Sequence, residues 1–419
     1  MNTAFRLIAT ALLPASIAAA PLAVSKAEDA GMSSERLARV AALVQRHIDE
    51  KDISGAVTLV ARRGKVVHFE AHGLADIDAH RPMQTGALFR MASMTKPLTA
   101  VSVLMLMEEG KLLLRDPVSK YIPEFKAPKV AVWRLPNDPA GAGATLVDAE
   151  REITIKDLLT HTSGLANGFA GPAGDFVRRA NLPAGGSLDQ RVRRLAPLPL
   201  NFQPGTQWEY SPSTGFDTLG RIVELRSGMN LAQFFKARIF DPLAMKDSFF
   251  DVPPTRAADR VLAYTKGEHG LTPTRQPLGG IADGEYYSGA GGMTGTAQDY
   301  LQFCQMLLNG GHLNGTRLIG RKTVELMTSD ATPGLDLRNY LNGEQVLQGY
   351  GFGLGVRVRR NNGENGWLGT PGDYGWAGAL GTYFWIDPKE ELIGMILIQT
   401  PIRALRMEFP NAVYQAIVD

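Results

Sequence analysis

The chain has 419 residues, of which 44% are hydrophobic and 21% charged, and its 44 lysines and arginines nearly balance its 42 aspartates and glutamates. These values argue against a disordered chain or a coiled coil. A formal charge of +2 gives no basic surface of the kind that binds nucleic acid. The single cysteine, Cys304, excludes an internal disulfide, and its apolar, helical surroundings predict a core residue.

The first 27 residues have the composition of a secretory signal peptide. One basic residue, Arg6, precedes an apolar stretch over residues 7–20, and small side chains follow. We expect cleavage between residues 20 and 27. A cut after residue 27 removes Arg6 and Lys26 and no acidic residue, so the formal charge falls from +2 to 0.

Pro14 interrupts the apolar stretch, which is also short for a bilayer, so a retained anchor is the weaker alternative. The sequence therefore predicts an exported protein, periplasmic or secreted. It predicts no nucleic-acid partner and no stable membrane anchor, and it leaves the oligomeric state open.

The mature chain, residues 28–419, has strand-like patterns at both ends. After a helical pattern over residues 33–48, two strand-like runs follow at about 55–75, and others occupy about 349–400, before a terminal helix at about 411–418. Strands at both ends predict one antiparallel sheet formed by the two termini. The fold class is therefore α+β, with a single catalytic domain.

A mostly helical region, about residues 80–340, lies between these strands. Thr154 and Thr296 each stand three residues before an aspartate, which is the pattern of a helix cap. Two segments rich in proline and glycine, 126–150 and 165–205, predict irregular excursions of the kind that line a site.

Ser93 and Lys96 lie three residues apart at the start of the apolar run SMTKPLTAVSVLMLM. Residues at this spacing share one face of a helix. Burial and a helix N-terminus both disfavour the charged form of a lysine, and a neutral amine can take the proton of a neighbouring hydroxyl. In the alternative interpretation, Ser93 caps the helix and Lys96 extends into water.

Two further features favour the chemical interpretation. Tyr210 stands in a loop immediately before an apolar helix, where a phenol can share a proton with Lys96. The stretch Trp376-Ala377-Gly378-Ala379 has small residues at the start of a predicted strand, where backbone can approach a substrate closely and offer an N–H to an oxyanion.

From about residue 33 onward, the chain resembles the serine β-lactamase and penicillin-binding protein superfamily. It is most similar to the branch shared by class C β-lactamases, D-alanyl-D-alanine peptidases and family VIII carboxylesterases. The resemblance rests on the fragments SMTK, ITIKDLLTHTSGL, WEYS, GAGGMTGTAQDY and GWAGALGT, in this order. It implies a β-lactamase-like fold and an acyl-enzyme mechanism.

The resemblance also implies roles for individual residues. Ser93 would be the acylated nucleophile, Lys96 its proton partner and Tyr210 the tyrosine of the second family motif, with the identity of the base left open. The backbone N–H groups of Ser93 and Ala379 would form the oxyanion hole. His161 and the segment GAGGMTG match family positions that we interpret as structural.

The chain departs from class C β-lactamases at two motifs. Trp376-Ala377-Gly378 stands where those enzymes have Lys-Thr-Gly, so the cation that would meet a β-lactam carboxylate is missing. Pro212 stands where they have an asparagine, and proline has no side-chain amide. The sequence therefore predicts a substrate pocket at Trp376, Ala377 and Gly378 that favours neutral esters. The alternative for Trp376 is plain core packing.

We therefore expect an exported carboxylesterase that acts on short- to medium-chain esters. One alternative is a class C-like β-lactamase or D-alanyl-D-alanine carboxypeptidase; another is an acyltransferase or a non-catalytic peptide-binding relative. No Gly-x-Ser-x-Gly elbow of an α/β-hydrolase occurs. The seven histidines are scattered without a His-Glu-x-x-His motif, so we expect neither a metal nor another cofactor.

Overall fold

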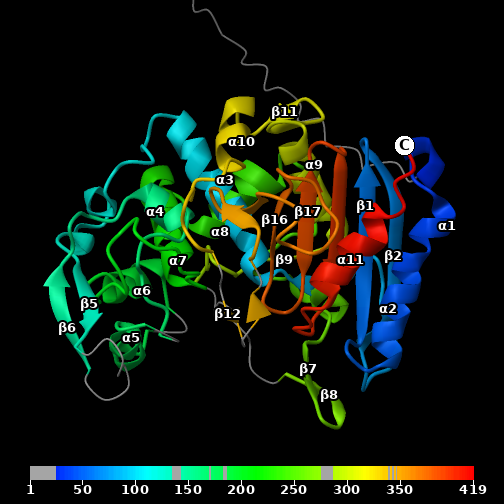
Figure 1. The fold of residues 1–419 in the computed structure, drawn as a ribbon, viewed down its shortest axis with the longest axis horizontal. Helices are drawn as coiled ribbons and strands as arrows, with labels where there is room; N and C mark the ends of the chain where they lie inside the picture. The colour runs from blue at the N-terminus through cyan, green and yellow to red at the C-terminus, as the bar shows by residue number, and fades with distance from the viewer. Residues whose placement is uncertain are drawn as a thin grey trace, which may run out of the picture.

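An eight-stranded antiparallel sheet joins the two ends of the chain in the computed structural model (Figure 1). The strand order is β14-β15-β16-β17-β18-β1-β2-β3, and β1 pairs with β18 so that Val57 lies opposite Leu397. The strands are β1 Gly55–Arg62, β2 Lys65–Asp76, β3 Arg81–Pro82, β14 Tyr350–Phe352, β15 Arg357–Arg359, β16 Tyr374–Ala377, β17 Tyr383–Asp387 and β18 Leu392–Leu397. The expected fold class is thus confirmed.

The structure describes residues 25–134, 143–168, 171–182, 186–274, 286–337, 340–341, 344–345 and 347–419. Residues 1–24, which carry most of the expected signal peptide, lie outside this part of the chain. Among the described residues, none of the helices has both the length and the apolar character needed to cross a membrane.

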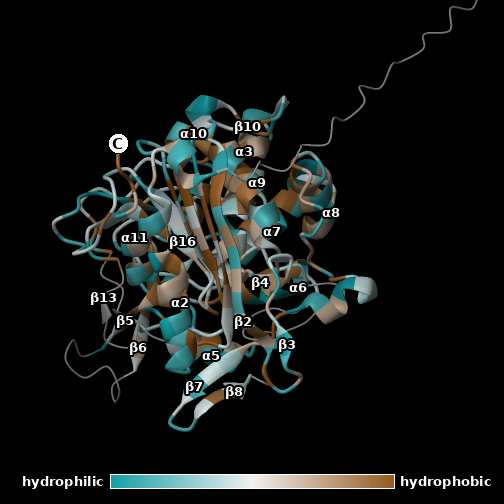
Figure 2. Ribbon diagram, turned by 90° about the vertical axis from the view of Figure 1, so that its right-hand side faces the viewer, coloured by the Kyte–Doolittle hydropathy of each residue, from teal (hydrophilic) through white to brown (hydrophobic). Residues whose placement is uncertain are grey.

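Helices cover both faces of the sheet. On one face lie α1 Ser34–Leu37, α2 Arg39–Asp49 and α11 Leu405–Tyr414, which share a core with the outer sides of β1, β17 and β18 (Figure 1). The other face carries the larger core and the inserted helices. These are α3 Thr95–Glu108, α4 Ile155–Leu159, α5 Gly174–Ala180, α6 Leu188–Leu195, α7 Thr214–Ser227, α8 Leu231–Phe235, α9 Ala297–Leu308 and α10 Arg321–Met327. Figure 2 shows hydrophobic residues concentrated in the interior between these layers.

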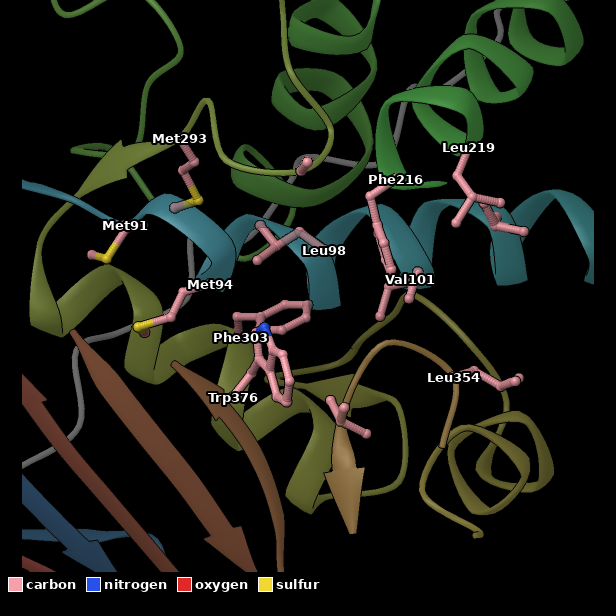
Figure 3. Close-up of a cluster of buried hydrophobic side chains, with 14 of the residues drawn as sticks. Met91, Met94, Leu98, Val101, Phe216, Leu219, Met293, Phe303, Leu354 and Trp376 are labelled. Carbon is pink, nitrogen blue, oxygen red and sulfur yellow. The ribbon is translucent and has the colours of Figure 1, made fainter. Parts of the chain in front are cut away.

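Helix α3 is the centre of the larger core. Every residue from Thr95 to Leu106 is buried, so the helix has no solvent-facing side. Side chains of α3 and of the preceding turn meet Phe216 and Leu219 of α7, Phe303 of α9 and Trp376 of β16 in one apolar cluster (Figure 3). Any polar side chain on this helix therefore needs a partner inside the protein.

Four expected boundaries were wrong. The terminal helix begins at Leu405 and not near residue 411, because Leu405 and Phe409 already pack on the sheet. The segment GALGTYFWID, residues 378–387, has the pattern of one strand, but its first five residues form a turn and β17 begins only at Tyr383. The segments 126–150 and 165–205 are more ordered than expected. The first contains the hairpin of β5 Lys129–Trp133 and β6 Ala144–Asp148, and the second contains α5 and α6.

Smaller paired strands complete the inserted region. They are β4 Phe89–Arg90 with β9 Thr294–Gly295, β7 Tyr264–Gly267 with β8 Gly270–Pro273, β10 His312–Leu313 with β11 Thr316–Arg317, and β12 Tyr340–Leu341 with β13 Glu344–Gln345. The pair β4–β9 matters most for the site, because it joins the chain just before Ser93 to the segment that follows residue 290.

Gly394 of β18 lies directly opposite Trp385 of β17, and a Cβ at Gly394 would stand 2.1 Å from the Trp385 ring. We expect Gly394→Ala to lower the free energy of unfolding by about 1–3 kcal/mol, the usual cost of overpacking. Gly363→Ala is the control, because no atom lies within 4 Å of a Cβ there. Thermal unfolding followed by circular dichroism measures both; equal Tm values for the two variants would contradict this prediction.

Candidate active site

Ser93 and Lys96 lie at the junction of a short 3₁₀ turn, Ala92–Met94, and helix α3. We expected the helix to begin at Ser93. It begins at Thr95, and Ser93 lies in the turn before it. Ala92 has a φ of 46°, a left-handed conformation that is strained for alanine. This bend leaves Ser93 partly exposed, whereas Lys96 is completely buried.

The Lys96 ammonium position is fixed by three oxygen atoms. Its Nζ lies 3.0 Å from Ser93 Oγ, 2.7 Å from the carbonyl oxygen of Pro212 and 2.9 Å from that of Ala290. The alternative in which Lys96 extends into water is therefore wrong. A side chain with no exposure that contacts a reachable hydroxyl has the geometry for proton transfer.

Tyr210, from the coil before α7, contacts Ser93. Its hydroxyl donates to Ser93 Oγ at 2.7 Å, and Lys96 Nζ lies 5.1 Å from the centre of its ring. Tyr210 stands in the coil four residues before α7 begins at Thr214, as the sequence predicts. Ser93 Oγ thus has an amine on one side and a phenol on the other, which brings together three residues expected to be catalytic.

His161 packs against the segment that carries Tyr210. It is buried, its Nδ1 lies 3.2 Å from Ser211 Oγ, and its ring centre lies 4.8 Å from that of Tyr210. Burial and the nearby Lys96 hold the pKa of His161 well below its usual value, so the ring is neutral. A neutral ring packed beside Tyr210 adds no competing charge to the site.

The turn after β16 packs directly against the chain before Ser93. A Cβ at Gly378 would lie 2.5 Å from the carbonyl oxygen of Met91, so only glycine fits there. Thr382 at the end of the turn donates to the same carbonyl at 3.2 Å. Ala379, the expected second oxyanion donor, lies within this turn rather than on a strand.

Trp376 is 8% exposed and belongs to the larger core. Its ring centre lies 5.4 Å from that of Tyr210 and 5.1 Å from that of Phe352. Ala377 is partly exposed and Gly378 is buried. Of the three residues expected to line the pocket, Trp376 therefore combines core packing with contact to Tyr210.

A cavity of about 340 Å³ adjoins the other side of the Tyr210 segment. It lies between the start of α7 and the excursion that contains α5 and α6. The cavity is lined by Asn167, Gly168, Val177, Arg178, Asn181, Leu182, Arg191, Ser213 and Thr214. Of these residues, Asn167 also donates to the carbonyl oxygen of Tyr210 at 3.2 Å.

The one described group of residues with metal-ligand spacing lies elsewhere. Ligand atoms of His47, Glu50 and Asp52 fall within 4.8 Å of one another. His47 and Asp52 already bond each other at 2.6 Å, and Lys266 pairs with Asp52. This group lies at the end of α2, on the face of the sheet opposite to α3, and takes no part in the site around Ser93.

This fold and this site define a serine hydrolase of the β-lactamase and penicillin-binding protein superfamily. The family model described as Beta-lactamase matches residues 40–415, so the chain belongs to that family.

Among curated relatives, "Esterase EstB" from Burkholderia gladioli is 36% identical over 285 residues, 63% of this chain and 68% of that protein. A protein of Mycobacterium tuberculosis, "Protein Rv1367c", is 38% identical over 355 residues, 83% of this chain and 86% of that one. A solved structure described as "EstCE1, a hydrolase with promiscuous acyltransferase activity" has a TM-score of 0.75 at 27% identity and covers 92% of this chain and 99% of its own.

Sequence reasoning missed the backbone acceptors of Lys96 and also Arg406. The Arg406 guanidinium donates to the carbonyl oxygen of Gly378 at 2.6 Å and so holds the turn that carries Ala379. Burial, with the positive charges of Arg403 and Arg357, lowers the pKa of Arg406 to about 10. The sequence signal for Arg406 was its position next to Leu405 in the terminal helix. We expected that helix to begin near residue 411, so Arg406 fell outside it.

Removal of either proton-transfer group should slow ester cleavage. We expect Lys96→Ala to reduce kcat/KM at least about a hundredfold, because the hydroxyl of Ser93 loses its amine partner. Tyr210→Phe keeps the ring contacts with His161 and Trp376 and removes only the hydroxyl. It should also reduce the rate. Steady-state kinetics on a p-nitrophenyl ester measure both, and near wild-type turnover in Lys96→Ala would refute its assignment.

Replacement of Trp376 should separate packing from selectivity. Trp376→Ala opens a cavity in the core and should lower the free energy of unfolding by about 3–5 kcal/mol. Trp376→Phe keeps an aromatic ring beside Tyr210 and should stay folded while the ratio of kcat/KM values for short and longer acyl esters changes. Tm and an ester series measure the two effects; an unchanged ratio in Trp376→Phe would leave Trp376 a packing residue only.

Proposed function

We propose that the protein is an exported carboxylesterase that forms an acyl-enzyme on Ser93, with Lys96 and Tyr210 as the proton-transfer pair. The observation that carries the proposal is the position of Ser93 Oγ, 3.0 Å from Lys96 Nζ and 2.7 Å from the Tyr210 hydroxyl. A serine hydroxyl between an amine and a phenol can lose its proton as it attacks.

In the first half of the proposed reaction, Ser93 Oγ attacks the carbonyl carbon of an ester and its proton passes to the Lys96/Tyr210 pair. The N–H groups of Ser93 and Ala379 stabilise the negative charge on the carbonyl oxygen. The bond to the alcohol oxygen then breaks, and the pair returns the proton to the leaving alcohol. Water attacks the acyl-enzyme in the second half, which releases the acid and restores Ser93.

Neutral esters suit this site better than anionic amides. Trp376 stands where a β-lactam-binding lysine would be, and Pro212 turns only its backbone carbonyl toward Lys96. The similarity to "Esterase EstB" supports the same substrate class.

An acyltransferase is the second candidate function. The structure described as "Simvastatin Synthase (LovD) from Aspergillus terreus" has a TM-score of 0.76 at 26% identity and covers 91% of this chain. Transfer needs only that an alcohol, rather than water, attacks the acyl-enzyme on Ser93. A β-lactamase or D-alanyl-D-alanine carboxypeptidase remains the further alternative.

The apolar N-terminal stretch supports export, and the N-terminal sequence of the secreted protein would test it.

A panel of substrates tests the proposal. We expect short-chain p-nitrophenyl esters to be hydrolysed with much higher kcat/KM than nitrocefin or a D-Ala-D-Ala peptide, and Ser93→Ala to abolish the ester turnover. Added short alcohols measure transfer through the ester product. A preference for nitrocefin or the peptide, or ester turnover that survives in Ser93→Ala, would reject the carboxylesterase proposal.

A further inference from the structure

Asp217 is a buried carboxylate to which the proposed reaction assigns no part. It lies in the first turn of α7, is 1% exposed, and is surrounded by buried residues of the same helix. A charge in such a place needs several donors. Asp217 has four: the hydroxyl of Tyr286, Ser288 Oγ at 2.7 Å, the N–H of Ala290 at 3.3 Å and Arg191 Nε at 3.2 Å.

Three of these four donors belong to the segment 286–290, which also supplies an acceptor to Lys96. Ala290 gives its N–H to Asp217 and accepts from Lys96 Nζ through its carbonyl oxygen at 2.9 Å. Burial and the Asp217 charge raise the pKa of Tyr286, so its hydroxyl remains a donor. Asp217 therefore fixes the orientation of the residue whose carbonyl holds the lysine.

The second acceptor of Lys96 is anchored in the same place. Pro212 precedes the start of α7 by two residues, and the N–H of Asp217 closes the first helical turn on the carbonyl of Ser213 at 2.9 Å. Arg191 donates to Ser213 Oγ at 3.2 Å as well as to Asp217. One carboxylate thus ties together the two segments whose carbonyl groups surround Lys96 Nζ.

We propose that Asp217 is a positioning residue that directs Lys96 toward Ser93 by fixing the Ala290 carbonyl. This inference rests on the proposed function, in which Lys96 exchanges a proton with Ser93. The side-chain partners that the structure gives Asp217 are Tyr286, Ser288, Ala290 and Arg191, and Ser93 is not among them. We therefore expect its effect on the rate of acylation and not on substrate affinity. Misplacement by about 1 Å at a distance from the chemistry can lower a rate about a hundredfold.

Asp217→Asn tests the proposal. The amide keeps nearly the same size, but in either orientation its NH₂ faces a group that can only donate, the guanidinium of Arg191 or the N–H of Ala290. We expect kcat to fall about a hundredfold while KM changes by less than about threefold. Fluorophosphonate labelling of Ser93, followed by intact mass, should slow to a similar extent.

Asp116→Asn is the matched control. Asp116 is 8% exposed and has donors of the same kinds: the hydroxyl of Tyr121 at 2.5 Å, Lys120 Nζ at 3.0 Å and the N–H of Leu113 at 2.8 Å. It lies beyond the far end of α3 from Ser93. We expect a loss of Tm comparable to that of Asp217→Asn with kcat and labelling rate close to wild type.

Ser288→Ala provides a milder test if Asp217→Asn does not fold. It removes one donor to Asp217 and also the hydroxyl that accepts from the N–H of Ala290 at 3.2 Å, while the carboxylate and Arg191 stay in place. We therefore expect about a tenfold loss in the labelling rate. Wild-type labelling rates in Ser288→Ala and in any folded Asp217→Asn would overturn the proposal, as would an equal loss in Asp116→Asn. The labelling rate needs no ester substrate, so a protein that is labelled but hydrolyses no ester would reject the carboxylesterase and leave the positioning role standing.

Discussion

The rest of the site depends on the complete burial of one amine. Lys96 has no exposure to water, so each hydrogen-bonding position of its Nζ must be satisfied by the protein. The two carbonyl oxygens can only accept, whereas Ser93 Oγ can accept or donate. An ammonium donates to all three; a neutral amine donates to the carbonyls and accepts from Ser93. The proton can therefore move without loss of a hydrogen bond, which suits a group that takes a proton and returns it.

This constraint explains why distant segments of the chain must meet. Ser93 comes from the turn before α3 and Lys96 from the first turn of α3. Pro212 comes from the coil before α7, and Ala290 from the segment before β9. The sheet also contributes to the site, because its strand β16 lies beside the 3₁₀ turn Ala92–Met94 that carries Ser93. Gly378 allows that approach, since any Cβ there would collide with the Met91 carbonyl. The sheet therefore holds the turn that carries Ala379 against the chain before Ser93 and does more than close the domain.

The features of the structure that could be predicted from the sequence are those that depend on patterns of side chains. The spacing of Ser93 and Lys96 in an apolar run, the loop position of Tyr210 and strands at both ends were sufficient for the fold class and the central contacts. Backbone carbonyls have no signature of their own, so Pro212 and Ala290 could not be recognised as partners of Lys96. Asp217 was visible as a charge in a buried helix, but three of its four donors lie about seventy residues later and the fourth, Arg191, precedes it, so only the fold brings them together.

Trp376 packs directly against the phenol that contacts Ser93. Its ring lies between the core and Tyr210, and His161 packs on the other side of the same phenol. A change of the Trp376 ring therefore also affects the position of the phenol hydroxyl that contacts Ser93. The cavity beside α5 and α6 meets the site through other residues: Arg191 and Ser213 line it, and both belong to the hydrogen-bonded group around Asp217. Val177 and Leu182 also line it but take no part in that group. Because close packing transmits shape changes mainly to direct neighbours, a change of Val177 or Leu182 disturbs the geometry at Ser93 less than a change of Arg191 or Ser213.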